Sequence, residues 1–196
     1  MKKNDATKDL IIRTSIILFN EKGYGQTSIQ DIMDATRLPK GAIYRRFKNK
    51  NDIALASFEK SGEILMSHFL EAVQSKDTAT EKIIAMYYVY EDAVGNPPIS
   101  GGCPLLNTAI ESDYSFPELR EKASLSYNKT LLFIKSILDE GINNNEFHNE
   151  LNSHSLASFI LAAFEGSIMA SRVTHNNDHI LNLTHQIKTL LNQYKI

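Results

Sequence analysis

The sequence predicts an all-α protein of about nine helices, divided into a small N-terminal region and a larger region behind it. Apolar residues recur at the spacing of a helix along nearly the whole chain of 196 residues. Glycine, proline and asparagine positions divide this pattern into segments of helical length. No segment argues strongly for a strand, so a purely helical fold is the consistent interpretation.

The first two predicted helices have recognisable start and stop residues. Residues 7–22 form an amphipathic stripe, and Gly23 ends it because glycine accepts the left-handed conformation that follows many helices. A second helix is expected over residues 28–36, since the Thr27 hydroxyl can cap its free amides. Gln30 stands where it would complete a capping box with Thr27.

A break at Pro39 separates this helix from a third. Proline disfavours helical backbone at the residue before it but suits the first helical position, so a new helix is expected over residues 39–47. Asn49, followed three residues later by Asp52, marks the start of a long fourth helix. Further helices are expected over residues 79–94, 103–113, 117–142, 152–174 and 177–194.

The domain boundary is expected inside the fourth helix. The chain has no internal repeat, no low-complexity tract and no Gly/Ser linker, so the two regions are expected to pack together rather than hang on a tether. The predicted domains are residues 6–66 and residues 67–196.

Charge is distributed unevenly along the chain. Residues 1–50 carry eleven Lys or Arg against five acids, and the remaining 146 residues carry ten against eighteen, although the whole chain has a net charge of −2. A basic head on an acidic body is typical of a module that binds a polyanion, because phosphate contacts supply affinity that does not depend on sequence. The alternative is a chance fluctuation in surface charge.

Cysteine usage and hydropathy favour a soluble protein of the cytoplasm. Cys103 is the only cysteine, which excludes an intrachain disulfide and a zinc site built from cysteine pairs. Residues 1–5 lack the apolar run of a secretory signal. The most apolar stretch, residues 156–164, is much shorter than the roughly 20 residues that cross a bilayer. We therefore expect no membrane partner.

The second and third predicted helices have the dimensions of a helix-turn-helix, with the motif at about residues 28–47. In the later helix, Ile43 and Phe47 lie one turn apart and are expected to face inward. Other positions are then available to double-stranded DNA. The predicted DNA-binding residues are Thr27, Ser28, Arg37, Lys40, Gly41, Ala42, Tyr44, Arg45, Arg46, Lys48 and Lys50.

The side chains in this set suit different parts of a duplex. Arg45 or Arg46 can donate two hydrogen bonds to a guanine edge. The lysines at positions 40, 48 and 50 are better suited to phosphates, as mobile point charges. The Tyr44 hydroxyl can reach a phosphate oxygen, so the third helix offers both base and backbone contacts.

Two further features would bring the protein backbone close to DNA. Gly41 and Ala42 are small enough to let the helix approach the groove floor, and Ala42 can touch a thymine methyl group. Thr27 and the amide end of the helix at Ser28 are expected to form an anion site, because free N–H groups at a helix start attract phosphate.

These N-terminal residues resemble the DNA-binding domain of the TetR family. The resemblance covers roughly residues 7–58 and rests on Leu18-Phe19, Gly23-Tyr24, Thr27-Ser28-Ile29, Asp31-Ile32 and the run from Lys40 to Lys50. Arg37 stands where the family usually has glycine and Pro39 where it usually has serine, which leaves the turn and the cap of the third helix less defined. Residues 101–113 look like a segment found in a subset of the family, which widens the resemblance to most of the chain.

The resemblance implies a transcriptional regulator. It implies a homodimer on a palindromic operator, an effector pocket in the C-terminal domain and, usually, repression that the effector relieves. A ligand that favours the wrong separation of the two recognition helices would release the DNA. Nothing in the residue spacing supports a catalytic triad or a phosphate loop, so no catalytic residue, metal or cofactor is expected.

Candidate effector residues lie in the second domain. Asn107 and Glu111 are four residues apart and share a helix face, although capping or surface roles are equally open. Tyrosines supply aromatic surface that suits a small apolar or aromatic effector, with core packing as the alternative. The predicted effector residues are Tyr88, Cys103, Asn107, Glu111, Tyr127 and Phe164.

The last two predicted helices are candidates for dimerisation. They carry apolar stripes with small residues between them, and the resemblance makes them the four-helix bundle of a dimer. The alternative is that the stripes fill the core of the single chain. The predicted interface residues are Phe159, Ala163, Ile168, Ile180, Leu183, Ile187 and Leu191.

Other functions remain open from the sequence alone. Cys103 follows two glycines near a helix start, a place that favours a reactive thiolate. The protein could therefore be a thiol-based sensor that uses Cys103, and the alternative is that Cys103 is a small buried hydrophobic residue. A helical ligand carrier with a basic head, which does not bind DNA, is a second alternative. His175 and His179 have a spacing that can bind a metal, but Asn176 and Asn177 between them are expected to end one helix and cap the next.

Overall fold

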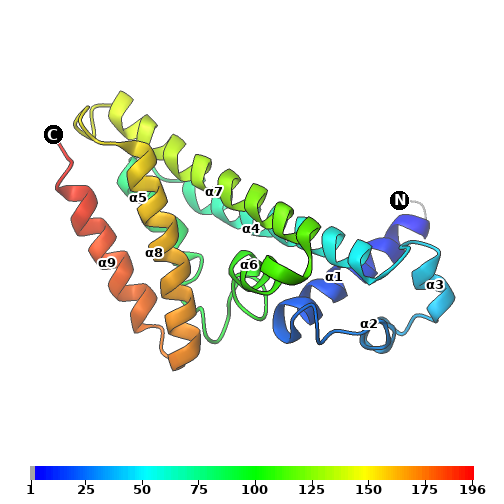
Figure 1. The fold of residues 1–196 in the computed structure, drawn as a ribbon. Helices are drawn as coiled ribbons and strands as arrows, with labels where there is room; N and C mark the ends of the chain where they lie inside the picture. Colours follow the sequence, from blue (N-terminus) through cyan, green and yellow to red (C-terminus); the bar gives the residue numbers. More distant parts are fainter. Residues whose placement is uncertain (1–2) are drawn as a thin grey trace. The chain divides into compact units, whose positions relative to one another are not determined.

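The computed structural model describes the backbone of residues 3–196 and the side chains of residues 6–112 and 116–196. In this part of the chain the secondary structure consists of nine α-helices and one isolated bridge between Phe147 and Lys195, which confirms the predicted all-α class. The helices (Figure 1) are α1 (Lys3–Lys22), α2 (Ile29–Thr36), α3 (Lys40–Tyr44), α4 (Lys50–Gln74), α5 (Ala79–Tyr88), α6 (Pro104–Ser115), α7 (Pro117–Asn143), α8 (Ser153–Thr174) and α9 (Asp178–Asn192).

Two helices are shorter than predicted. α3 ends at Tyr44 because the next amide bonds tighten, with the Arg46 N–H donating to the Ile43 carbonyl oxygen at 2.9 Å. α5 ends at Tyr88 and residues 89–95 form turns, in which Tyr90 donates to the Tyr87 carbonyl at 3.0 Å. Such bonds between residues three apart commonly close the last turn of a helix.

The predicted cap of α2 is wrong by one residue. Ser28, not Thr27, is the cap: its hydroxyl accepts from the Asp31 N–H at 3.1 Å, and the Asp31 carboxylate accepts from the Ser28 N–H at 2.8 Å. Asp31 therefore takes the place predicted for Gln30. The Thr27 side chain is buried, and its hydroxyl donates to the Gly23 carbonyl at 2.8 Å instead.

Three further predicted helix boundaries are confirmed. Gly23 follows α1 with φ of 86°, in the left-handed region, and its N–H donates to the Phe19 carbonyl at 2.9 Å. At the start of α4, Asn49 Oδ1 accepts from the Asp52 N–H at 2.9 Å. Residues 175–177 form the predicted break before α9, which places His175 and His179 on either side of a helix start rather than on one helix.

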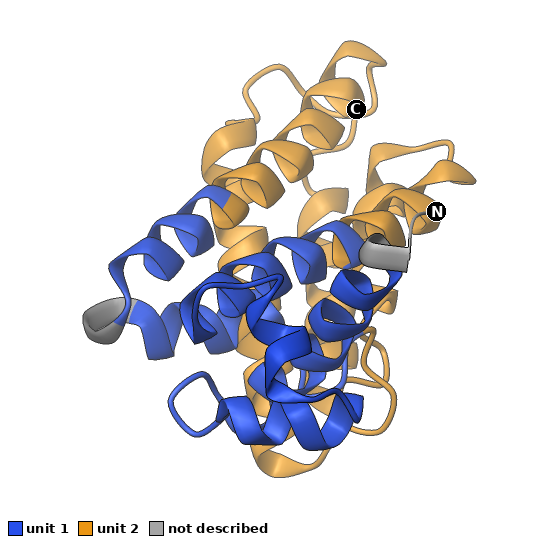
Figure 2. Ribbon diagram, turned by 90° about the vertical axis from the view of Figure 1, so that its right-hand side faces the viewer, with its two compact units in different colours: residues 1–64, 99–125 blue, residues 65–98, 126–196 orange. Residues whose placement is uncertain are grey.

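The chain forms two compact units (Figure 2). Unit 1 comprises residues up to 64 together with residues 99–125, and unit 2 comprises residues 65–98 and 126–196. The boundary at residue 64 lies inside α4. Residues 99–125, which the sequence placed in the second domain, pack with the N-terminal helices instead.

The core of unit 1 holds α2 and α3 in place. Ile11, Ile32, Ile43, Phe47 and Ile53 form one buried cluster that joins α1, α2, the end of the helix-turn-helix and the start of α4. The predicted inward positions Ile43 and Phe47 are therefore confirmed. Because Ile43 packs into this core, the opposite face of α3, with Lys40, Gly41 and Tyr44, is exposed to solvent.

The core of unit 2 is aromatic at its centre. The Phe164 ring on α8 packs edge-on against Phe69, Tyr87 and Tyr90, with ring centroids 6.1, 4.9 and 5.6 Å away. α9 lies beside α8 (Figure 1). By length and composition α8 is apolar enough to cross a membrane, and 39% of its most apolar window is buried within the fold.

Gly141 gives a stability prediction for unit 2. A Cβ added at this position on α7 would lie 2.6 Å from the Phe147 ring and 2.7 Å from the Ala79 Cβ. We expect Gly141→Ala to lower the free energy of unfolding by about 1–3 kcal/mol, because overpacking outweighs the gain in helix propensity. Denaturant unfolding measures this, with Gly41→Ala as the matched control since a Cβ there meets nothing within 4 Å. An equal or higher stability of Gly141→Ala would contradict the packing.

Candidate nucleic-acid interface and adjoining pocket

The outer face of α3 and the residues after it form an exposed basic surface. Lys40, Arg45 and Lys48 are exposed, and Tyr44 is 43% exposed. The Lys40 ammonium lies 5.8 Å from the centroid of the Tyr44 ring, within the range of a weak cation–π contact. Gly41 is exposed and nothing lies within 4 Å of where its Cβ would stand. This surface has the charge and the small central residue that a duplex groove requires.

Three predicted DNA contacts are not available as expected. Ala42 is only 6% exposed, so its methyl group belongs to the core of unit 1. Arg46 is half-buried, and its guanidinium donates to the Ala42 carbonyl at 2.9 Å. The Lys50 ammonium donates to the Tyr24 carbonyl at 2.7 Å and to the Thr27 carbonyl at 3.0 Å. The sequence did not indicate the hydrogen bonds of Lys50, because their carbonyl acceptors lie more than twenty residues away.

The anion site predicted at residues 27–28 is also wrong. The Thr27 side chain is buried, and the Ser28 N–H already donates to the Asp31 carboxylate. Hydrogen bonds from the Ser28 hydroxyl, then from Lys22, hold the pKa of Asp31 well below its usual range. A permanent negative charge therefore occupies the end of α2 where a phosphate was expected.

Arg37 lies in the turn of the helix-turn-helix in a conformation that arginine seldom adopts. Its φ is 56° and its ψ is 29°, in the left-handed region that favours glycine. The side chain is exposed. The turn thus keeps the geometry of a glycine turn while adding a guanidinium beside α3.

The loop between α1 and α2 is held on two sides. Lys50 binds two of its carbonyls, and the same ammonium lies 4.2 Å from the centroid of the Tyr24 ring. From α6, the Glu111 carboxylate accepts from the Tyr24 N–H at 2.7 Å and from the Gly25 N–H at 2.6 Å. The loop that positions α2 is therefore held in part by Glu111, which lies more than 80 residues further along the chain.

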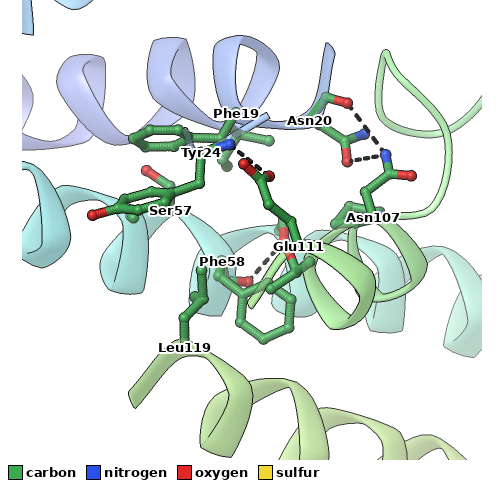
Figure 3. A pocket seen from close by; sticks show the side chains of 13 residues that line it. Phe19, Asn20, Tyr24, Ser57, Phe58, Asn107, Glu111 and Leu119 are labelled. Carbon is green, nitrogen blue, oxygen red and sulfur yellow. Dashed lines mark hydrogen bonds between the residues drawn. The ribbon is translucent and has the colours of Figure 1, made fainter. Parts of the chain in front are cut away.

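A pocket lies within unit 1 beside this loop (Figure 3). Its walls come from α1, α4, α6 and the start of α7, and it has an empty volume of about 440 Å³, which includes its open mouth. Phe19, Tyr24 and Phe58 supply aromatic surface, and Glu111 and Asn107 supply polar groups. Two of the predicted effector residues thus line one pocket.

A hydrogen-bond network closes one end of the pocket. The Asn107 side-chain amide donates to the side-chain oxygen of Asn20 at 2.9 Å (Figure 3). The Asn20 amide in turn donates to the Ser100 and Gly102 carbonyls at 2.7 and 3.0 Å. Gly101, with φ of 95°, brings the chain so close that an added Cβ would lie 2.5 Å from the Asn20 carbonyl oxygen. Sequence reasoning missed Asn20, since nothing local marks a contact that spans 80 residues.

The other predicted effector residues lie elsewhere. Cys103, at the start of α6, is 1% exposed, so its thiol is not accessible as a sensor of reagents in solution. Phe164 belongs to the packed aromatic centre of unit 2, and Tyr88, in the same unit, is 51% exposed. Tyr127, on α7, is half-buried. These four do not join the lining of the pocket in unit 1.

The predicted dimer residues separate into two groups. Ile168, Ile180, Ile187 and Leu191 are at most 1% exposed within the single chain, so we assign them to the core of unit 2. Phe159 is 54% exposed, and Ala163 and Leu183 are half-buried. On α8 the sequence could not separate the two groups because apolar residues occur on both faces of the helix.

Comparison with known proteins places the whole chain in one family. Residues 11–57 match the family model of bacterial regulatory proteins of the tetR family, and residues 79–187 match that of the tetracyclin repressor-like C-terminal domain. A TetR transcriptional regulator from Chloroflexus aurantiacus J-10-FL is 34% identical, with a TM-score of 0.94 over 100% of this chain and 98% of that one. A TetR-family regulator from Cytophaga hutchinsonii is 30% identical, with the same TM-score and coverage.

A curated relative agrees over a shorter length. An uncharacterised HTH-type transcriptional regulator in the lacX 3' region of Lactococcus lactis subsp. lactis is 33% identical over 107 residues, and the match spans 54% of each protein. The family models and the solved structures cover both units of this chain. The chain therefore belongs to the TetR family, and it is a DNA-binding transcriptional regulator.

Proposed function

We propose that the protein is a cytoplasmic repressor that binds a palindromic operator as a homodimer and leaves it when a small-molecule effector binds. The observation that carries this proposal is the exposed basic face of α3 on a rigid helix-turn-helix core. Two such faces related by a two-fold axis read two half-sites about 34–36 Å apart, or a multiple of that distance. The proposal involves no catalytic step.

The side chains of this face take different roles on DNA. Arg45 is exposed and charged, so it is the side chain we assign to a guanine edge, where a guanidinium can donate two hydrogen bonds. Lys40, Lys48 and Arg37 contact phosphates, and the Tyr44 hydroxyl donates to a phosphate oxygen. Gly41 allows the backbone of α3 to approach the groove. Arg46 and Lys50 position the structure instead, because both are bound to backbone carbonyls.

The dimer forms on the exposed face of α8. Phe159, Met169 and Val173 are 54%, 48% and 76% exposed and follow one another at helical spacing. Between them Gly166 is exposed, and nothing lies within 4 Å of where its Cβ would stand. An apolar stripe with a small residue at its centre lets a second α8 approach closely, as in an isologous dimer contact.

A reporter experiment tests repression. A recovered operator is placed over a promoter, and transcription is measured with wild type, with Arg45→Ala and without the protein. We expect wild type to lower transcription and Arg45→Ala to restore it. Higher transcription with wild type than without protein would overturn repression while leaving DNA binding intact.

Arg37 links stability and DNA affinity in opposite directions. Arg37→Gly is expected to raise the free energy of unfolding by about 1 kcal/mol, because glycine adopts the left-handed conformation without steric cost. The same change removes one phosphate contact in each chain, so the slope of log affinity against log salt should become shallower by about 0.9 per chain. Arg37→Lys keeps the charge and serves as the control. A salt slope that Arg37→Gly leaves unchanged would exclude the phosphate contact.

A further inference from the structure

The pocket in unit 1 has an unusual balance of charge. Among its thirteen lining residues, all of them described by the structure, Glu111 is the single charged side chain and there is no Lys, Arg or His. Its aromatic walls are Phe19, Tyr24 and Phe58, and Leu119 and Ile16 add aliphatic surface. Neutral Asn, Ser and Thr side chains complete the lining. A pocket that combines apolar surface, neutral polar groups and one carboxylate is complementary to a cation carried on an apolar body.

The electrostatic surroundings of the Tyr24 phenol agree with this charge balance. Burial, followed by the carboxylates of Glu111 and Glu118, raises the pKa of Tyr24. Lys50 lies over the Tyr24 ring, but its ammonium donates to two backbone carbonyls of the loop. The two carboxylates disfavour an added negative charge beside the phenol, whereas the Lys50 ammonium, which keeps its charge in these bonds, acts in the opposite direction. In the lining of the pocket itself, Glu111 is the single charged side chain.

The Glu111 carboxylate is also hydrogen-bonded to the loop that precedes the helix-turn-helix. Glu111 receives the Tyr24 N–H at 2.7 Å (Figure 3) and the Gly25 N–H at 2.6 Å. Both amides lie in the loop that leads to the cap of α2 at Ser28. A carboxylate offers about four acceptor positions, so a ligand N–H can share it with the chain. A ligand cation that draws on these oxygens weakens the bonds that the loop amides make.

We propose that this pocket is a binding site for a small organic cation, an amine or amidinium on an apolar or aromatic body, and that its occupation weakens operator binding through Glu111 and the loop at residues 23–28. The ligand must be compact, because the 440 Å³ of empty volume includes the open mouth. The binding site stands independently of the proposed function, whereas its effect on DNA rests on it.

The test uses three probes of the same size and different charge: benzamidine, benzamide and benzoate. Each is titrated by calorimetry into the full-length protein without DNA. We expect benzamidine to bind at least about tenfold more tightly than benzamide, since a hydrogen bond to a charged partner contributes more than a neutral one. We expect benzoate to bind most weakly. Equal affinity for benzamidine and benzamide, or no binding of either, would overturn the proposal.

Three variants locate the site. Glu111→Gln is expected to abolish the preference for benzamidine. Glu121→Gln removes an exposed carboxylate that lies outside the pocket, on α7, and is expected to retain the preference. Thr108→Met fills the pocket from its half-buried wall and leaves Glu111 in place, so it is expected to lose all probe binding. If Glu111→Gln fails to fold, Thr108→Met still decides: wild-type affinity for benzamidine in that variant would overturn the site.

Operator binding supplies the second readout. Benzamidine is expected to lower the operator affinity of wild type several-fold and to leave that of Thr108→Met unchanged. An equal effect on both proteins would overturn the coupling. Absence of site-selective DNA binding with no probe present would contradict the proposed function instead, and the calorimetric result would stand by itself.

Discussion

Replacing Phe159 with glutamate is expected to convert the dimer into a monomer and to lower operator affinity by about 100-fold or more. Phe159 is 54% exposed on the apolar face of α8, and a two-fold contact would bring two copies of this face together. A carboxylate buried in this contact loses its hydration without gaining a hydrogen bond or an ion pair, which is strongly unfavourable. A monomer binds one half-site at a time, so it lacks the additional affinity that a dimer obtains by binding both half-sites together.

Sedimentation at a fixed protein concentration measures the mass, and a DNA-binding titration measures the affinity. Leu132→Glu is the matched control, since Leu132 is 59% exposed on α7 and lies outside the proposed interface. The control is expected to remain a dimer with unchanged operator affinity. A Phe159→Glu protein that keeps the mass of a dimer would exclude α8 as the interface.

Replacing Arg45 with alanine is expected to lower operator affinity by about 10- to 100-fold for each half-site. A bidentate contact to guanine contributes about 1–3 kcal/mol of discrimination, and the dimer makes it twice. The loss should be confined to operators that carry the contacted base pair, so the variant should also become less selective at that position. Affinities for a set of single-base operator variants measure both effects.

Lys48→Ala provides the contrast. This side chain is exposed and assigned to a phosphate, so its removal should weaken binding to all sequences by a similar factor. The slope of log affinity against log salt should become shallower by about 0.9 for each phosphate that the variant no longer neutralises. If Arg45→Ala and Lys48→Ala changed affinity in the same way for every operator variant, α3 would not be the element that reads the bases.

The sequence predicted the helices well because their ends depend on local chemistry. Gly23 and Asn49 act through their own backbone or through neighbours within one turn, so their effect is visible in the sequence. The exception at Thr27 has a local cause as well: two hydroxyl residues stand side by side, and Asp31 selects Ser28 because its carboxylate accepts the Ser28 N–H.

The candidate site was less predictable because its main contacts are remote. Lys50 reads as one more basic residue in a basic segment, yet it is bound to carbonyls of a loop some 25 residues earlier. Glu111 and Asn107 could be placed on one helix face, but their partners in the loop and on α1 could not be inferred from spacing. On α8 apolar residues occur on both faces, so the sequence pattern does not distinguish the buried Ile168 from the exposed Phe159.

The most direct test of the regulator described here is selection of bound fragments from a random duplex pool at two salt concentrations, with wild type beside Arg45→Ala. We predict that wild type enriches a palindrome whose half-sites are about 10 base pairs apart, or a multiple of that, and that the variant loses this consensus. Enrichment of no sequence at either salt concentration, or of an asymmetric sequence that Arg45→Ala binds equally well, would contradict a two-fold dimer that reads DNA through α3.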